Sequence, residues 1–244
     1  MSENKPKNIQ QHSDNNQHLN LKDSALWIAA LYLPTFFLSI AYGIYVSSQA
    51  SITDPAAWFS DGDILSGFGI LMALVTLPVL YLATQKLTFN QRISFFALAN
   101  KFDSKEFYPW LVITLVFLSF WWAVNSIFDI EPPDIMLNIM QTTEYIWLLV
   151  LSICIVAPIF EELVFRGFIF ARLQRSVLGK SGALILTSLI FTLIHSQYQG
   201  IELFALFTFA ILLGLIRIKT NNIKYCILIH ALNNTLSLMA LYLL

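Results

Sequence analysis

The chain has 244 residues, of which 57% are hydrophobic and 12% charged, and its formal net charge is −1. Soluble domains carry about 25% charged residues, so this composition excludes an ordinary soluble domain and indicates an integral membrane protein. A net charge near zero does not favour nucleic-acid binding, and we expect no nucleic-acid partner. The two cysteines, Cys154 and Cys226, lie in apolar runs without CxxC or CxxH patterns, so we expect buried thiols.

The first 24 residues are rich in Asn and Gln and lack the apolar core of a signal peptide. We predict that residues 1–24 form a disordered cytoplasmic tail and that residues 25–244 form the membrane domain, without an internal repeat. Apolar runs of roughly 17 to 25 residues can span a bilayer as helices. The fold expected is therefore an all-α, polytopic transmembrane helix bundle of about seven spans: Ala25–Val46, Ile64–Thr84, Tyr108–Phe128, Tyr145–Ala171, Ala183–Tyr198, Leu203–Ile216 and Tyr225–Leu244.

All 14 Lys and Arg residues fall in the tail or around every second connection between these runs. Cytoplasmic loops collect basic residues, so we expect the N-terminus inside and the C-terminus outside. The segment Phe89–Phe107 mixes basic and aromatic residues, and we expect an amphipathic helix along the inner interface.

The stretch APIFEELVFRGF in the fourth run places Glu161, Glu162 and Arg166 inside an otherwise apolar span. A charge at mid-bilayer costs roughly 2.5–3.5 kcal/mol, so such residues are functional candidates. Glu162 and Arg166 are four positions apart, about 40° around a helix, and are suited to pair on one face. For these two residues, a purely structural ion pair and a functional role remain equally open.

Glu161 points about 100° away from Glu162 and about 140° away from Arg166, so it requires another partner. The candidates are His195 and His230, because the other two histidines lie in the tail. A lone histidine on an apolar helix is usually a satisfied core residue, but two of them together with a buried carboxylate favour a shared site. A hairpin between the fourth and fifth runs brings Glu161 and His195 to the same height.

Two further residues extend this predicted site. Asn234 follows His230 by four positions and faces the same way. Pro158 removes one backbone hydrogen bond and is expected to kink the fourth helix one turn before the glutamates. Kinks of this kind are tolerated where they line a cavity.

A carboxylate, two imidazoles and a carboxamide are suited to water attack on a carbonyl. In this interpretation Glu161 is the general base, and His195 helps to hold and polarise the water. His230 and Asn234 are suited to donate hydrogen bonds to the oxyanion of the tetrahedral intermediate. The site therefore predicts hydrolysis of a peptide bond.

Three motifs in these residues resemble the type II CAAX prenyl endopeptidase and bacteriocin-processing family, called CPBP or Abi. They are EExxxR (Glu161, Glu162, Arg166), FxxxH (Phe191, His195) and HxxxN (His230, Asn234). The resemblance covers about residues 145–239 and implies that this segment is the catalytic core of an intramembrane endopeptidase. It implies that Glu161 and His195 activate water and that His230 and Asn234 form the oxyanion hole. Glu162, Arg166 and Phe191 then support the site.

We expect a membrane-associated peptide or protein substrate and a location in the cytoplasmic membrane of a bacterium. Two other classes stay open: a non-catalytic bacteriocin-immunity or scaffold protein, and a proton-coupled transporter that uses Glu161 and the histidines as a relay. No cofactor is expected. The alternative is zinc bound by Glu161, His195 and His230, which have the right ligand types, although the HExxH spacing is absent.

Overall fold

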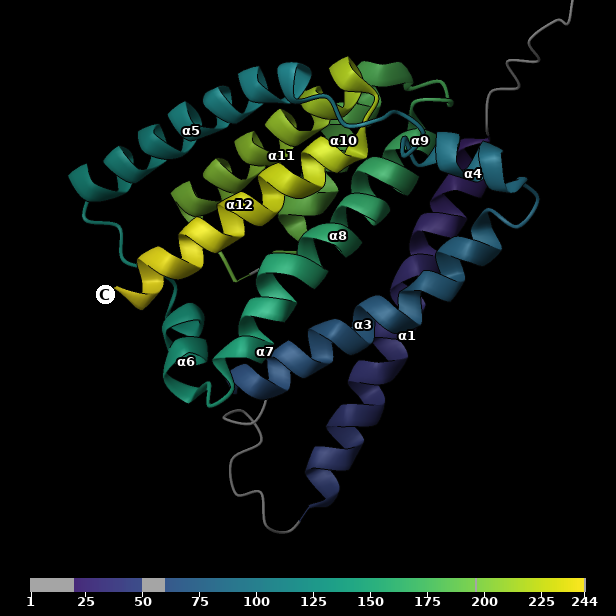
Figure 1. Ribbon diagram of the computed structural model, residues 1–244. Coiled ribbons are helices and arrows are strands. Elements are labelled where there is room, and N and C mark those ends of the chain that lie inside the picture. Colours follow the sequence, from purple (N-terminus) through teal and green to yellow (C-terminus); the bar gives the residue numbers. More distant parts are fainter. Residues whose placement is uncertain (1–19, 50–59, 196, 244) are drawn as a thin grey trace, which may run out of the picture.

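The computed structural model describes residues 20–49, 60–195 and 197–243, and within these ranges the chain is helical, without strands. The all-α prediction is therefore confirmed (Figure 1). The α-helices and two π-helical segments (η1 and η2) are α1 Leu21–Ser48, α3 Gly62–Ala83, α4 Phe89–Phe95, α5 Ser104–Ile127, α6 Asp134–Thr142, α7 Ile146–Val150, η1 Leu151–Val156, α8 Ala157–Glu162, η2 Leu163–Ile169, α9 Phe170–Leu173, α10 Gly179–Leu193, α11 Gly200–Thr220 and α12 Ile223–Tyr242.

Among the described residues, 6 helices are long and apolar enough to cross a membrane: α1, α3, α5, the continuous helix Ile146–Leu173, α11 and α12. The fifth predicted span, Ala183–Tyr198, corresponds to α10, which has 15 residues. At 1.5 Å per residue it is about 22 Å long, shorter than the roughly 30 Å hydrocarbon core. The predicted end at Tyr198 is wrong, because α10 stops at Leu193 and His195 lies in the turn that follows.

The helix Ile146–Leu173, here called the fourth helix, lies at the centre of the bundle. It packs against α3 on one side and against α10, α11 and α12 on the others (Figure 1). Two π-helical segments, η1 and η2, flank its α8 turn. Pro158 lies at the beginning of α8, directly after η1, so the backbone change near this proline takes the form of a π-helical segment. Such segments often occur at functional sites.

The connections predicted to be cytoplasmic gather at one end of the bundle. The Asn100 side chain donates to the carbonyl of Thr220 at 3.4 Å, and Asn222 donates to the carbonyl of Lys101 at 3.1 Å. The two predicted outer loops meet in the same way, since the Gly62 amide donates to the Thr142 hydroxyl at 2.9 Å. The bundle therefore separates the two sets of loops, while the side that is cytoplasmic stays a prediction.

Two local expectations are wrong. The expected interfacial helix Phe89–Phe107 is helical only as α4, because a turn with Ala97 at φ 53° interrupts it and α5 begins at Ser104. The expected disorder does not extend to residue 24, since Asn20 caps α1 by accepting a hydrogen bond from the Lys22 amide at 2.9 Å. The remainder of the predicted tail, residues 1–19, lies outside the described residues.

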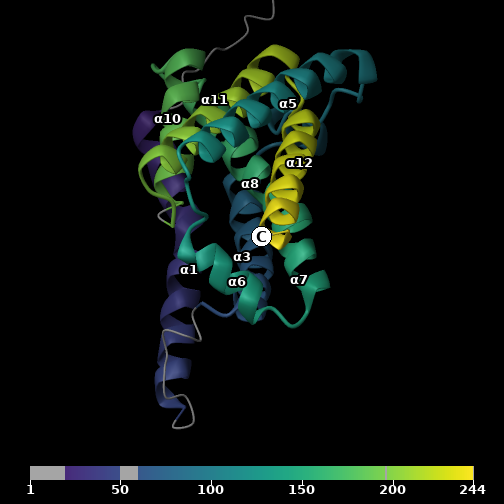
Figure 2. The ribbon, with the colours of Figure 1, turned by 90° about the vertical axis from the view of Figure 1, so that its left-hand side faces the viewer.

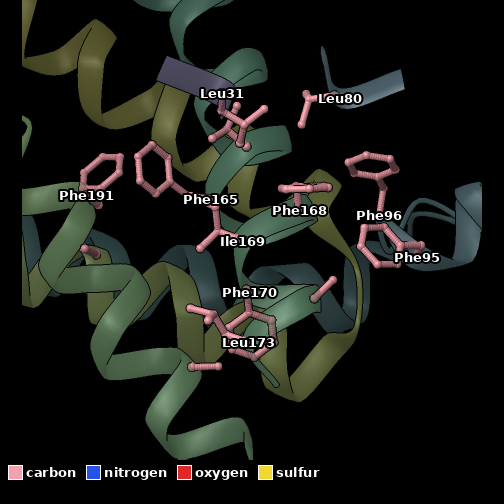
Figure 3. Close-up of a cluster of buried hydrophobic side chains, with 14 residues drawn as sticks. Leu31, Leu80, Phe95, Phe96, Phe165, Phe168, Ile169, Phe170, Leu173 and Phe191 are labelled. Atoms are coloured by element: carbon pink, nitrogen blue, oxygen red, sulfur yellow. The ribbon is translucent and has the colours of Figure 1, made fainter. Parts of the chain in front are cut away.

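A buried aromatic cluster surrounds the second half of the fourth helix, next to the predicted cytoplasmic end (Figure 3). Leu31 of α1 packs into this cluster, whereas the far half of α1 extends beyond the other helices (Figure 2). Both Cys154 and Cys226 are free and buried, as predicted. The cluster members labelled in Figure 3 are Leu31, Leu80, Phe95, Phe96, Phe165, Phe168, Ile169, Phe170, Leu173 and Phe191.

Candidate active site

Glu162 and Arg166 form a buried ion pair on the fourth helix. Arg166 Nη1 donates to Glu162 Oε1 at 2.9 Å, and the side chain of Arg166 is 1% exposed and that of Glu162 0%. The guanidinium also donates from Nη2 to the carbonyl of Ala210 in α11 at 3.1 Å. Its Cζ lies 4.6 Å from the centre of the Phe191 ring, which is fully buried. The predicted pairing is present, and Arg166 also joins the fourth helix to α11.

His230 of α12 contacts the same carboxylate, because its Nδ1 lies 2.9 Å from Glu162 Oε1. The sequence analysis paired Glu162 with Arg166 and did not predict this contact with a histidine. Because α12 packs against α8, the side chain of His230 reaches both glutamates. The ion pair and the predicted catalytic group are therefore one network.

Glu161 faces both histidines through a single oxygen atom. Its Oε2 lies 4.0 Å from His195 Nε2 and 3.9 Å from His230 Nε2, longer than direct hydrogen bonds. This oxygen is buried and has no hydrogen-bond partner among the described residues. The structure thus brings together Glu161, His195 and His230 around one point, as the sequence predicted.

The other ring nitrogen of each histidine fixes its tautomer. His195 Nδ1 lies 2.6 Å from the carbonyl oxygen of Phe191, which only accepts, so Nδ1 carries the hydrogen. His230 Nδ1 lies 2.9 Å from Glu162 Oε1, the oxygen that accepts from Arg166, so Nδ1 is also the donor. In the neutral rings both Nε2 atoms are therefore acceptors. Three acceptor atoms converge, an arrangement that a hydrogen-bond donor or a cation between them would satisfy.

Asn234 is held by the backbone of the fourth helix. Its Nδ2 donates to the carbonyl oxygen of Ile153 at 2.9 Å. In η1 the amide of Ala157 bonds to the carbonyl of Ser152, five residues earlier. With the same spacing, the carbonyl of Ile153 would accept from the backbone nitrogen of Pro158. Proline has no N–H, so the Ile153 carbonyl lacks that backbone donor and Asn234 replaces it. The oxyanion role of Asn234 remains a prediction.

Arg217 is a buried residue that the sequence analysis did not assign to the membrane interior. It was placed in a cytoplasmic loop, but α11 continues to Thr220 and Arg217 is 3% exposed. Its Nε donates to the carbonyl oxygen of Arg166 at 3.1 Å, and its Nη1 donates to Asn221 Oδ1 at 2.6 Å. The spacing of seven residues from Ala210, which puts both on one helical face, could have indicated this position.

In the described part of the chain, no group of three or more His, Cys, Asp or Glu side chains is gathered closely enough to hold a metal ion. The donor types of Glu161, His195 and His230 nevertheless suit zinc, with the Phe191 carbonyl and Glu162 orienting the two rings. Ligand atoms of tetrahedral zinc are about 3.4 Å apart, and the observed separations of 3.9 and 4.0 Å are wider than this.

The fold and this network define a polytopic, multi-pass membrane protein with a buried glutamate–histidine site. Residues 143–236 match the family described as type II CAAX prenyl endopeptidase Rce1-like, which confirms the resemblance found in the motifs. The match includes all seven predicted site residues and both π-helical segments. The chain has no match among curated proteins or solved structures.

Proposed function

We propose that the protein is an intramembrane endopeptidase that hydrolyses a peptide bond of a membrane-associated peptide or protein. The observation that carries this proposal is the convergence of Glu161 Oε2 with the two Nε2 atoms, at 4.0 and 3.9 Å, in a buried position. The family match supports a peptidase. Two hydrogen bonds of about 2.8 Å each can bridge such separations, so one water molecule fits the role of the shared partner.

In the proposed reaction Glu161 removes a proton from this water as the hydroxide oxygen attacks the carbonyl carbon of the substrate. His195 Nε2 accepts the second hydrogen of the water and so directs the attacking lone pair. The tetrahedral intermediate then breaks its C–N bond, and the proton held by Glu161 passes to the leaving amine. The products are a carboxylic acid and an amine, and Glu161 returns to its ionised form.

His230 and Asn234 are the proposed oxyanion donors. His230 lies between Glu161 and Glu162, and in its imidazolium form Nε2 becomes a donor while Nδ1 keeps its bond to Glu162. Asn234 uses one amide hydrogen for Ile153 and has a second one that is suited to the oxyanion. These assignments would make Glu162 and Arg166 the support that fixes the orientation of His230.

A zinc ion bound by Glu161, His195 and His230 would polarise the water or the carbonyl. We propose the metal-free reaction, because it gives each of the three side chains a separate proton-transfer or donor role. Removal of zinc from purified protein by a chelator should leave activity unchanged. Activity that disappears on removal and returns with stoichiometric zinc would favour the metal.

The central experiment compares membrane-associated peptides in cells that express the wild type or Glu161→Gln, using quantitative proteomics. Glu131→Gln is the matched control, because Glu131 is an exposed glutamate in a connection remote from the site in sequence. We expect one or more cleavage products to disappear in Glu161→Gln and to persist in Glu131→Gln at equal protein abundance. Identical peptide sets in all three strains would contradict the proposed activity and favour a scaffold.

We also propose a bacterial cytoplasmic membrane as the location, with the basic connections facing the cytoplasm. The segregation of the Lys and Arg residues outside the buried Arg166 and Arg217 supports this orientation. Reporter fusions after Thr53 and Pro133 should read outside, and fusions after Asn100 and Asn221 should read cytoplasmic. An outside signal at Asn221 would contradict it.

A further inference from the structure

Tyr32 of α1 has a buried hydroxyl group that has no hydrogen-bond partner among the described residues. A buried phenol usually finds such a partner, because leaving it without one costs free energy. The neighbouring residues of α1 are largely apolar and partly face the surface. A lipid-facing helix does not by itself need a buried hydroxyl group at this position, so we expect an acceptor near it.

The carboxylate of Glu161 lies at a similar height, because α1 and the fourth helix run in opposite directions (Figure 1) and Asp23 pairs with Arg172, nine residues from Tyr32 and eleven from Glu161. Glu161 Oε2 is itself buried and without a hydrogen-bond partner in the described part of the chain. A phenol can donate a hydrogen and an ionised carboxylate can only accept one, so the two groups are chemically complementary. Each is the kind of partner that the other lacks.

The packing of α1 holds Tyr32 in this place. The adjacent Leu31 is 3% exposed and belongs to the same buried cluster as Phe165 of the fourth helix (Figure 3). At the beginning of α1, Asp23 forms an ion pair with Arg172 near the end of the fourth helix. These contacts attach α1 to the helix that carries Glu161, although α1 lies outside the matched residues 143–236.

A second tyrosine near the site has different surroundings. The Tyr198 ring stacks on that of His195, with ring centres 6.4 Å apart. Burial is the main cause that raises the pKa of the Tyr198 phenol, and the charges of Glu202 and then Glu161 raise it further. The Tyr198 hydroxyl is not one of the buried groups left without a partner, so Tyr32, rather than Tyr198, has an unused donor to offer Glu161.

We propose that Tyr32 is a positioning residue of the active site, whose hydroxyl donates to Glu161 Oε2, directly or through one water, and keeps this carboxylate directed at the two histidines. The effect of Tyr32 on catalysis rests on the proposed function, whereas its contact with Glu161 does not depend on any substrate. It assigns a part of the site to an N-terminal helix that the family match does not include.

Infrared difference spectroscopy of the purified full-length protein tests the contact. The carboxyl C=O band of Glu161, recorded at a pH low enough to protonate it, is identified as the band that Glu161→Gln removes. In Tyr32→Phe, which keeps the ring and removes only the hydroxyl, this band should move to higher wavenumber. Tyr45→Phe is the matched control on the same helix, because Tyr45 is 54% exposed, and it should leave the band unchanged.

Activity on a peptide identified by the proteomic comparison gives the second readout. Tyr32→Phe should lower kcat about tenfold with KM unchanged, because it affects the base rather than substrate binding. An unshifted Glu161 band in a folded Tyr32→Phe protein would overturn the proposal, whatever the activity. A shifted band in a protein whose wild type cleaves nothing would retain the Tyr32 contact and reject the endopeptidase function.

Discussion

Buried polar side chains are satisfied differently in the N-terminal helices and in the segment that contains the site. In α3 and α5 two buried hydroxyls bond within their own helix: that of Ser66 donates to the carbonyl of Gly62 at 2.6 Å, and that of Thr114 to the carbonyl of Trp110 at 2.8 Å. In the matched segment hydroxyls such as that of Thr192 also bond within their own helix, but the buried arginine and asparagine side chains bond between helices, as Arg166 does to Ala210. The first kind forms as soon as a helix forms, whereas the second requires the bundle to assemble.

This difference shows where the fold has a defined geometry to maintain. A hydroxyl that bonds four residues back leaves the helix free to rotate or slide against its neighbours. The bonds from Arg217 to the Arg166 carbonyl and from Asn234 to Ile153 fix the height and rotation of α11 and α12 against the fourth helix. A catalytic group needs such fixed geometry, because small displacements of reacting groups cost large factors in rate.

The largest effect is expected from breaking the buried ion pair. Arg166→Ala leaves the carboxylate of Glu162 without its cation and should cost about 3–5 kcal/mol of stability, with a strong loss of folded protein. Glu162→Ala should also lower abundance.

Glu161→Ala is the control and should keep normal abundance, since its side chain is 20% exposed and has no ion pair with an arginine among the described contacts. Thermal unfolding in detergent and fluorescence-detected size exclusion measure these effects. Normal stability of Arg166→Ala would contradict the network.

A smaller effect is expected at Arg217. Arg217→Met keeps much of the side-chain volume but removes the donor to the Arg166 carbonyl, which should cost about 1.5–3 kcal/mol. The cost is below that of Arg166→Ala, because Arg217 forms no ion pair with a carboxylate in the described structure and no buried anion is left alone. The same unfolding assay measures both variants, and the reverse order of stability would contradict this comparison.

Asn234 and Pro158 should be energetically coupled through Ile153. Asn234→Ala leaves the Ile153 carbonyl without its donor and should cost about 1–2 kcal/mol. Pro158→Ala restores a backbone N–H beside that carbonyl, so the double variant should lose less stability than the sum of the single variants. A double-mutant cycle measures this coupling. Strict additivity would show that the proline and the asparagine act independently.

The smallest effect is expected for a hydroxyl in the N-terminal part. Thr114→Val removes a bond to the carbonyl of Trp110, which remains part of the backbone ladder of α5, so the change in stability should stay below about 0.5 kcal/mol. Unfolding in detergent provides the measurement. A loss as large as that of Asn234→Ala would remove the distinction between the two regions.

Much of the architecture was predictable because it depends on properties that a short segment carries by itself. Apolar length located the spans, and helical spacing paired Glu162 with Arg166. The errors of these predictions concern helix ends. The predicted end of α10 lies beyond Leu193, and Arg217 is predicted in a loop although α11 continues to Thr220. Hydrophobic runs do not specify helix ends to within a turn, since polar residues can continue a helix when another helix covers them.

The sequence alone thus determined the helical membrane class, the segregation of basic residues and the set of side chains suited to the site, since hydrophobicity and 3.6-residue periodicity are intrinsic to the chain. Only the tertiary structure decided that His230 contacts both glutamates, that Asn234 bonds to Ile153 and that Arg217 bonds to the carbonyl of Arg166. These relations depend on the relative height and rotation of helices that are far apart in sequence. Interhelical packing sets both quantities, and no spacing within a single helix contains them.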